Sequence, residues 1–168
     1  MKKIINSLKM RHTYFILLLF GLFACDSNTD VLKSKIDSLE KQLADTYKPG
    51  FGEIMGSIQI HHSKLWFSGV NENWKLAEFE VHELTESVED IEKYQKEREE
   101  SKFMDMIFPA LDSVSLAIKQ KDTGLFKKSY SLLTKTCNEC HQITNYQFII
   151  VKNPDTQIFH NQDFRLKQ

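Results

Sequence analysis

The chain has 168 residues, of which 41% are hydrophobic and 27% charged, a composition typical of one globular domain with its own core. Residues 1–24 carry four basic residues and no acidic one, and without them 18 Lys and Arg face 23 Asp and Glu, a formal charge of −5. This mild acidity argues against a nucleic-acid-binding protein and leaves no basic stripe that could bind phosphates.

The first 24 residues have the layout of an export signal. Basic residues precede an apolar run from Tyr14 to Ala24, which is shorter than the roughly 20 residues of a permanent transmembrane helix. The run ends in Leu22-Phe23-Ala24-Cys25, which resembles a bacterial lipoprotein signal. The resemblance implies cleavage before Cys25, lipidation of its thiol, and a domain tethered to a membrane of the cell envelope, in the periplasm or at the cell surface. The alternatives are an ordinary signal peptide and an uncleaved anchor.

Residues 25–50 are expected to form a lipid-anchored linker and an amphipathic helix. Between charged residues, apolar ones recur at intervals of three and four, namely Val31, Leu32, Ile36, Leu39, Leu43 and Tyr47. Such a helix would pack on the domain or on a copy of itself, which leaves a homodimer open. Pro49-Gly50 then breaks the helical pattern.

Four further helical patterns occupy residues 51–148. We expect Gly69 to end the first of them and Pro109 to cause a kink or a late start in the third. Residues 149–168 read as an extended tail that packs on these helices, because the apolar run 148–151 has no second strand to pair with. The chain is therefore predicted to be all-α, with helices beginning near Phe51, Asn71 or Asn73, Ser101 and Thr123.

Acidic residues and a histidine gather in the second of these helical patterns. A di-iron site would require Glu-x-x-His on two helices, and only a solvated acidic face is expected here. The chain also lacks G-x-S-x-G, a phosphate loop and H-E-x-x-H, so we predict a protein that is not an enzyme. The residues assigned to the acidic face are Glu78, Glu80, His82, Glu83 and Glu86.

The most specific motif is Cys137-Asn138-Glu139-Cys140-His141 in the fourth pattern. Two cysteines three residues apart, followed directly by a histidine, form the attachment motif of a c-type haem: the thiols add to the vinyl groups and the imidazole binds the iron. On a helix the three side chains share one face, and this face continues the apolar stripe of the segment. We therefore predict one covalent haem c, with Cys137 and Cys140 as the attachment residues and His141 as the proximal ligand.

Other uses of the two cysteines are less consistent with the sequence. A structural zinc site needs four ligands, and the chain contains no second CxxC and no H-x3-5-H pair. A thioredoxin-like pair would follow a strand, whereas a long helical pattern precedes this one. A plain disulfide or an inert pair of thiols is the remaining alternative. Export also favours the haem, because bacterial c-type haem is attached outside the cytoplasmic membrane.

An exported set of four helices with CxxCH in the last one resembles cytochrome c-prime and its low-spin relatives. The resemblance implies an antiparallel four-helix bundle over about 51–148, with the helix at 31–47 and the C-terminal tail as additions. It also implies electron transfer with a redox partner protein, or gas binding and protection at an open sixth iron position. A haem-free lipoprotein with an interaction role is a third hypothesis.

The resemblance places any sixth iron ligand on the first helix of the bundle. The inward face of that helix carries two candidates, Met55 and, two turns later, His62. Met55 would give a high-potential iron suited to electron transfer, and His62 a bis-histidine iron of lower potential. Both also have ordinary interpretations, as core packing and as a hydrogen-bonded core histidine. His61 is expected at the surface, and Trp66 and Trp74 would wall the pocket or fill the core.

Overall fold

The computed structural model describes residues 26–46 and 48–165. Within these ranges there is no strand, so the prediction of an all-α chain is confirmed for them, and the fold is compatible with a helical bundle. The export signal and Cys25 lie outside the described residues. The elements are α2 (Asp26–Thr46), α3 (Phe51–Val70), α4 (Trp74–Tyr94), the 3-10 helix η1 (Glu100–Ile107), α5 (Phe108–Gln120) and α6 (Thr123–Ile143).

The chain divides into two units, one ending at Tyr47 and one beginning at Lys48. In the first unit, α2 is a single helix whose apolar stripe is exposed along its length, at Val31, Leu32, Ile36, Leu39 and Leu43. Among the helices that the structure describes, none has both the length and the apolar character needed to cross a membrane.

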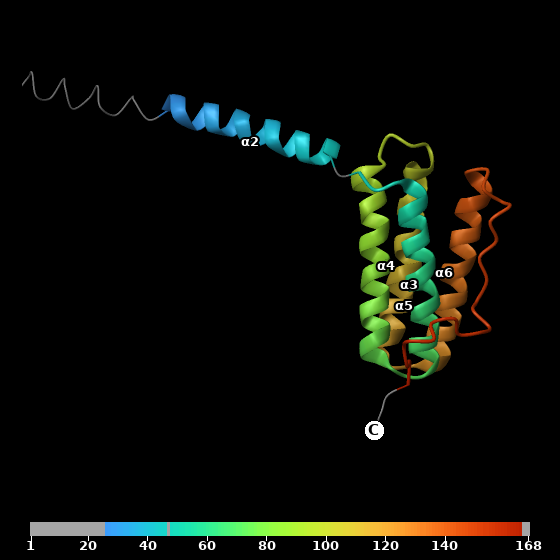
Figure 1. Ribbon diagram of the computed structural model, residues 1–168. Helices are drawn as coiled ribbons and strands as arrows, with labels where there is room; N and C mark the ends of the chain where they lie inside the picture. The colour runs from blue at the N-terminus through green and yellow to red at the C-terminus, as the bar shows by residue number, and fades with distance from the viewer. Residues whose placement is uncertain (1–25, 47, 166–168) are drawn as a thin grey trace, which may run out of the picture. The chain divides into compact units, whose positions relative to one another are not determined.

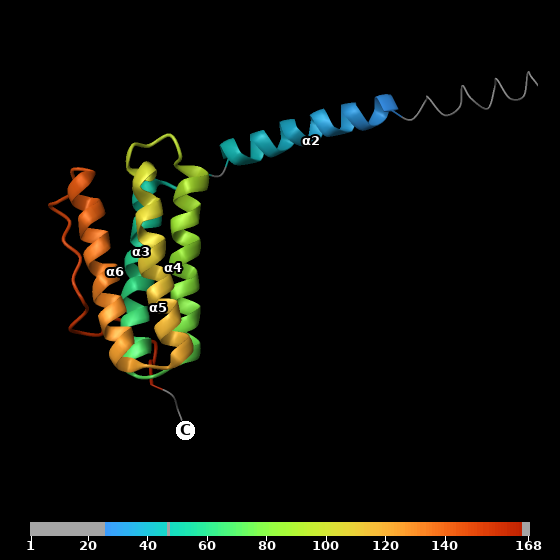
Figure 2. The same cartoon turned by 180° about the vertical axis from the view of Figure 1, so that it is seen from behind.

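The second unit contains α3, α4, α5 and α6, which lie side by side in Figures 1 and 2. Each helix contacts the next one along the chain, and α6 also contacts α3. Their inward faces form one apolar core, and burying it supplies the main stabilisation of the unit. The residues with no exposed surface include Leu65, Val88, Ile91, Val114, Phe126, Tyr130 and Leu133.

Local chemistry explains where these helices begin. Of the two asparagines considered for the start of α4, Asn73 is the cap, because its side-chain oxygen accepts from the backbone N–H of Leu76 at 3.4 Å. Asp122 caps α6 in the same way, accepting from Leu125 N–H at 2.8 Å. Pro109 is the second residue of α5, where its missing N–H is not needed, so it produces the late start and not a kink.

Gly69 does not end α3, contrary to the prediction. The helix continues to Val70, and the left-handed residue of the following turn is Glu72, with φ of 57°. The role of Gly69 is steric, since a Cβ at this position would lie 2.1 Å from Cζ of Phe126. The absence of a side chain lets the Phe126 ring pack directly on the backbone of α3.

Candidate haem-attachment site

The CxxCH motif occupies the last two turns of α6. The apolar stripe of the helix continues into it: Cys140 is buried, and Cys137 is partly buried against the core. Both are free thiols and form no disulfide with each other. His141 is partly exposed and faces the segment that follows α6.

Both thiols are held in the neutral form. Burial raises the pKa of Cys137 to about 12, and burial, with a smaller contribution from the negative charge of Glu100, also raises that of Cys140. In the part of the chain that the structure describes, no three His, Cys, Asp or Glu side chains come together as a group that could hold a metal ion.

One nitrogen of His141 has a fixed partner. Its Nδ1 lies 2.8 Å from the backbone carbonyl oxygen of Ile149. A carbonyl can only accept, so Nδ1 carries the proton and donates, and the neutral ring keeps its lone pair on Nε2. This is the tautomer in which a histidine binds a metal through Nε2. Two neutral, unbonded thiols and this histidine fit a c-type haem.

His62 lies in the core between α3 and α6, and both of its nitrogens have partners. Its Nε2 is 3.0 Å from Oγ1 of Thr134, and its Nδ1 is 2.9 Å from the hydroxyl of Tyr130. The same hydroxyl donates to the backbone carbonyl of His62 at 2.6 Å. Burial lowers the pKa of His62 to about 4, so the ring is neutral at pH 7. An iron bond to Nε2 would require the loss of the contact with Thr134.

Met55 lies closer to the level of the motif than His62 does. Thr123 pairs with Glu72, whereas Tyr130 and Thr134 pair with His62, so the contacts run in opposite order along α3 and α6. Met55 precedes His62 by seven residues. On α6, Cys137 follows Tyr130 by seven residues, and His141 follows Thr134 by seven. Each step is a rise of about 10 Å along a helix. The partly buried Met55 packs on the core cluster that contains Cys140.

His61, which we predicted at the surface, is only partly exposed, and Glu80 is not part of a solvated face. The carboxylate of Glu80 is 1% exposed and lies 2.8 Å from Nδ1 of His61, whose side chain is 17% exposed. Helical phase could have identified Glu80, since it stands three residues after the buried Ala77 and four before the buried Leu84. His82 is exposed as expected and pairs with Glu86.

Both tryptophans contact the ring of Phe126. Trp66 packs on the rings of Phe126 and Tyr130, with centroids 6.4 and 4.9 Å away, and Trp74 meets Phe126 edge-on at 6.2 Å. Both are partly buried and pack against the core. Trp66 lies near His62, since both rings contact Tyr130.

A charged cluster that the sequence analysis missed adjoins the motif. Glu100, in η1, accepts from Nη2 of Arg98 at 2.7 Å and from the hydroxyl of Tyr146 at 2.9 Å. The hydrogen bond from Arg98 is the largest of the effects that lower the pKa of Glu100 to about 2, so this carboxyl is charged at pH 7. Tyr146 belongs to the turn after α6, and the cluster therefore joins this turn to η1.

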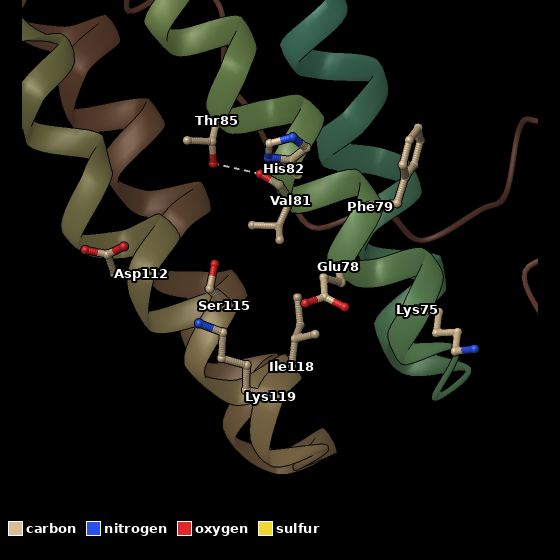
Figure 3. A pocket seen from close by; sticks show the side chains of 10 residues that line it. All are labelled: Lys75, Glu78, Phe79, Val81, His82, Thr85, Asp112, Ser115, Ile118 and Lys119. Atoms are coloured by element: carbon tan, nitrogen blue, oxygen red, sulfur yellow. Dashed lines mark hydrogen bonds between the residues drawn. The ribbon is translucent and has the colours of Figure 1, made fainter.

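One surface hollow lies away from this site. It has a volume of about 550 Å³ between α4 and α5 (Figure 3), and the exposed Phe79 and His82 are among its lining residues. Figure 3 also shows Asp112 and Lys119 on the α5 side. A second hollow, of about 300 Å³, adjoins the motif and is lined by Asn138, Gln142, Gln147, Ile149 and Ile150.

Comparison with known proteins gives no match to any protein family, any curated protein or any solved structure. Any function is therefore inferred from the residues themselves. The structure brings Cys137, Cys140, His141 and Met55 to one end of the unit and places His62 in a hydrogen-bonded position about two turns away. Cys25 lies outside the described residues, so its lipidation stays a prediction.

Proposed function

We propose that this chain is a membrane-tethered monohaem c-type cytochrome that transfers electrons to or from a redox partner protein. Cys137 and Cys140 hold one haem c covalently, and His141 binds its iron through Nε2. The haem supplies the one-electron iron couple. The observation that carries the proposal is the hydrogen bond from His141 Nδ1 to the carbonyl of Ile149, which keeps Nε2 available on the same helical face as two neutral thiols.

The arrangement of α3, α4, α5 and α6 supports an antiparallel four-helix bundle of the cytochrome c-prime type. Contacts between α3 and α4 pair Ser57 with Ser87 and His61 with Glu80, again in opposite order along the two helices. The motif is in the last of these helices, as the resemblance requires. Helix α2 and the segment after α6 are additions to this plan.

Membrane attachment belongs to the same proposal. Lipidation of Cys25 would tether the domain at the cell envelope, in the periplasm or at the cell surface, with α2 between the lipid and the domain. A homodimer stays a prediction.

Covalent haem is tested on exported protein. We expect the full chain to retain haem on a denaturing gel after boiling and to gain the mass of one haem, because two thioether bonds survive denaturation. The double variant Cys137→Ser/Cys140→Ser should lose all of this haem. Cys25→Ser is the matched control, which should lose membrane attachment and keep its haem. A colourless wild-type protein with two free thiols would contradict the proposal and favour a haem-free lipoprotein with an interaction role.

The sixth position is assigned to Met55, with His62 as the second candidate. Met55 lies about level with the motif, whereas both nitrogens of His62 are already hydrogen-bonded. A thioether ligand favours reduced iron and raises the potential, which suits an electron carrier.

A spectroscopic comparison tests this assignment. We expect reduced wild-type protein to be six-coordinate and low-spin, and Met55→Leu, which conserves volume, to become high-spin and to bind carbon monoxide at least about tenfold faster. His62→Gln is the matched control and should stay low-spin. The reverse pattern would identify His62 as the ligand.

The alternative function, gas binding or protection at an open iron site, has one observation in its favour. Both nitrogens of His62 already have hydrogen-bond partners, and Met55 is only partly buried. An iron bonded to neither side chain would keep an open sixth position. High-spin wild-type iron that binds carbon monoxide as fast as Met55→Leu would support this alternative over electron transfer.

A further inference from the structure

The segment after α6 returns along the helix that carries the motif. Asn145 adopts a left-handed conformation with φ of 67°, which asparagine tolerates better than most residues, and Tyr146 N–H donates to the carbonyl of His141 at 2.7 Å. The chain then reverses and runs beside α6, as Figure 1 shows in orange and red. We call residues 149–153 the strap.

Alternate residues of the strap are bonded to successive turns of α6. The carbonyl of Ile149 meets His141, the backbone of Val151 meets Asn138, and Oδ1 of Asn153 meets Oγ1 of Thr134 at 3.0 Å. Two extended residues span about 6.6 Å, close to the 5.4 Å of one helical turn, so each second residue finds a partner.

The strap is held by polar contacts more than by apolar burial. The intervening Ile150 is 80% exposed, and Phe148, just before the strap, is 74% exposed. Neither side chain is buried on α6, whereas farther along the predicted tail Phe164 is 4% exposed and its ring packs on that of Phe67 in α3. The position of the strap therefore depends on its hydrogen bonds, and on those of Val151 in particular.

Asn138, the first variable residue of the CxxCH motif, forms two hydrogen bonds with one residue of the strap. Its Nδ2 donates to the carbonyl of Val151 at 2.8 Å, and its Oδ1 accepts from the N–H of Val151 at 2.8 Å. Nδ2 donates its second hydrogen to the carbonyl of Thr134 at 3.0 Å. Only a primary amide both donates and accepts in this way, so the side chain of Asn138 acts toward Val151 as a neighbouring strand would.

We propose that Asn138 is a positioning residue for His141, which acts by fixing the strap so that the carbonyl of Ile149 holds the proton on Nδ1. This inference rests on the proposed function, because it concerns an iron ligand. A hydrogen bond from Nδ1 strengthens electron donation from Nε2 and stabilises oxidised iron. Loss of the clamp should therefore weaken that donation and raise the reduction potential.

The test uses exported, haem-loaded full chain in three variants. Asn138→Ala removes both bonds to Val151, and it should fold because alanine favours a helix. Asn138→Asp keeps the acceptor for the Val151 N–H and loses the donor. Gln142→Ala is the matched control, since Gln142 lines the same hollow and the described structure gives its side chain no hydrogen bond to the strap.

We expect amide exchange at Val151 to become at least about tenfold faster in Asn138→Ala. The reduction potential should rise and the iron–imidazole stretching frequency of the reduced protein should fall. Asn138→Asp should lie between Asn138→Ala and wild type, and Gln142→Ala should match wild type. A role confined to chain packing would change exchange alone.

The outcomes separate two kinds of failure. An unchanged potential and stretching frequency in Asn138→Ala that retains covalent haem would overturn the positioning role and leave the proposed function intact. Equal shifts in Gln142→Ala would also overturn it, because any disturbance of the hollow would then suffice. A wild-type protein without haem would instead overturn the proposed function, and this inference with it.

Discussion

Replacement of Gly69 by alanine is expected to lower the free energy of unfolding by about 3 kcal/mol, the upper end of the usual cost of overpacking a core. The added Cβ would lie 2.1 Å from Cζ of Phe126, and two further ring carbons are within 2.6 Å. The ring cannot move away easily, since Phe126 has no exposed surface and is surrounded by Trp66, Trp74 and Tyr130. Urea denaturation followed by circular dichroism measures the change.

Gly56→Ala is the matched control on the same helix. A Cβ at Gly56 would meet nothing within 4 Å, so the substitution should stabilise the protein by about 0.5–1 kcal/mol through helix propensity alone. Equal stability of the Gly69→Ala variant and wild type would show that Phe126 does not pack on α3 as described.

The second large effect concerns acid. Burial lowers the pKa of His62 from 6.5 to about 4, so between these values the unfolded chain binds a proton that the folded chain does not. Stability should therefore be fully present above about pH 6.5 and fall toward pH 4, where folded protein also binds the proton. A shift of this size corresponds to about 3 kcal/mol. Urea midpoints measured across this pH range give the slope.

His62→Gln should be less stable at pH 7 and should lose most of this pH dependence, because glutamine can form hydrogen bonds but does not titrate in this range. His160→Gln, at an exposed position, is the matched control and should keep the wild-type slope. If the slope in haem-loaded protein were the same in wild type and His62→Gln, His62 would not be the group that responds to acid.

Helical periodicity predicted the elements of the chain well, because each helix of the second unit has one buried face. Capping chemistry identified the region in which α4 begins, and Pro109 marked the start of α5. The sequence pattern predicted that Gly69 ends α3, whereas this glycine leaves room for the ring of Phe126. The two roles cannot be told apart from the sequence. The buried pair of His61 and Glu80 was missed because charge was given more weight than helical phase.

Only the side chains of the candidate site could be predicted from the sequence, and not the backbone groups that contact them. Spacing is the basis for proposing Cys137, Cys140 and His141, but the acceptor for His141 is a backbone carbonyl, which any residue at position 149 would provide. The role of Asn138 depends on how the chain turns after α6, and the sequence pattern did not specify this reversal. Our proposal of Met55 over His62 as the sixth ligand uses the order of contacts between α3 and α6, which the sequence does not give.

The contact of His61 with Glu80 also constrains which sequences can share this fold. A carboxylate that is 1% exposed cannot exchange its protein partner for water, so the loss of His61 alone would leave a buried charge without a donor. A substitution at position 61 or position 80 is therefore tolerated only when the other residue changes as well. In homologous chains the two positions should be inherited together, as histidine with glutamate or as two apolar residues.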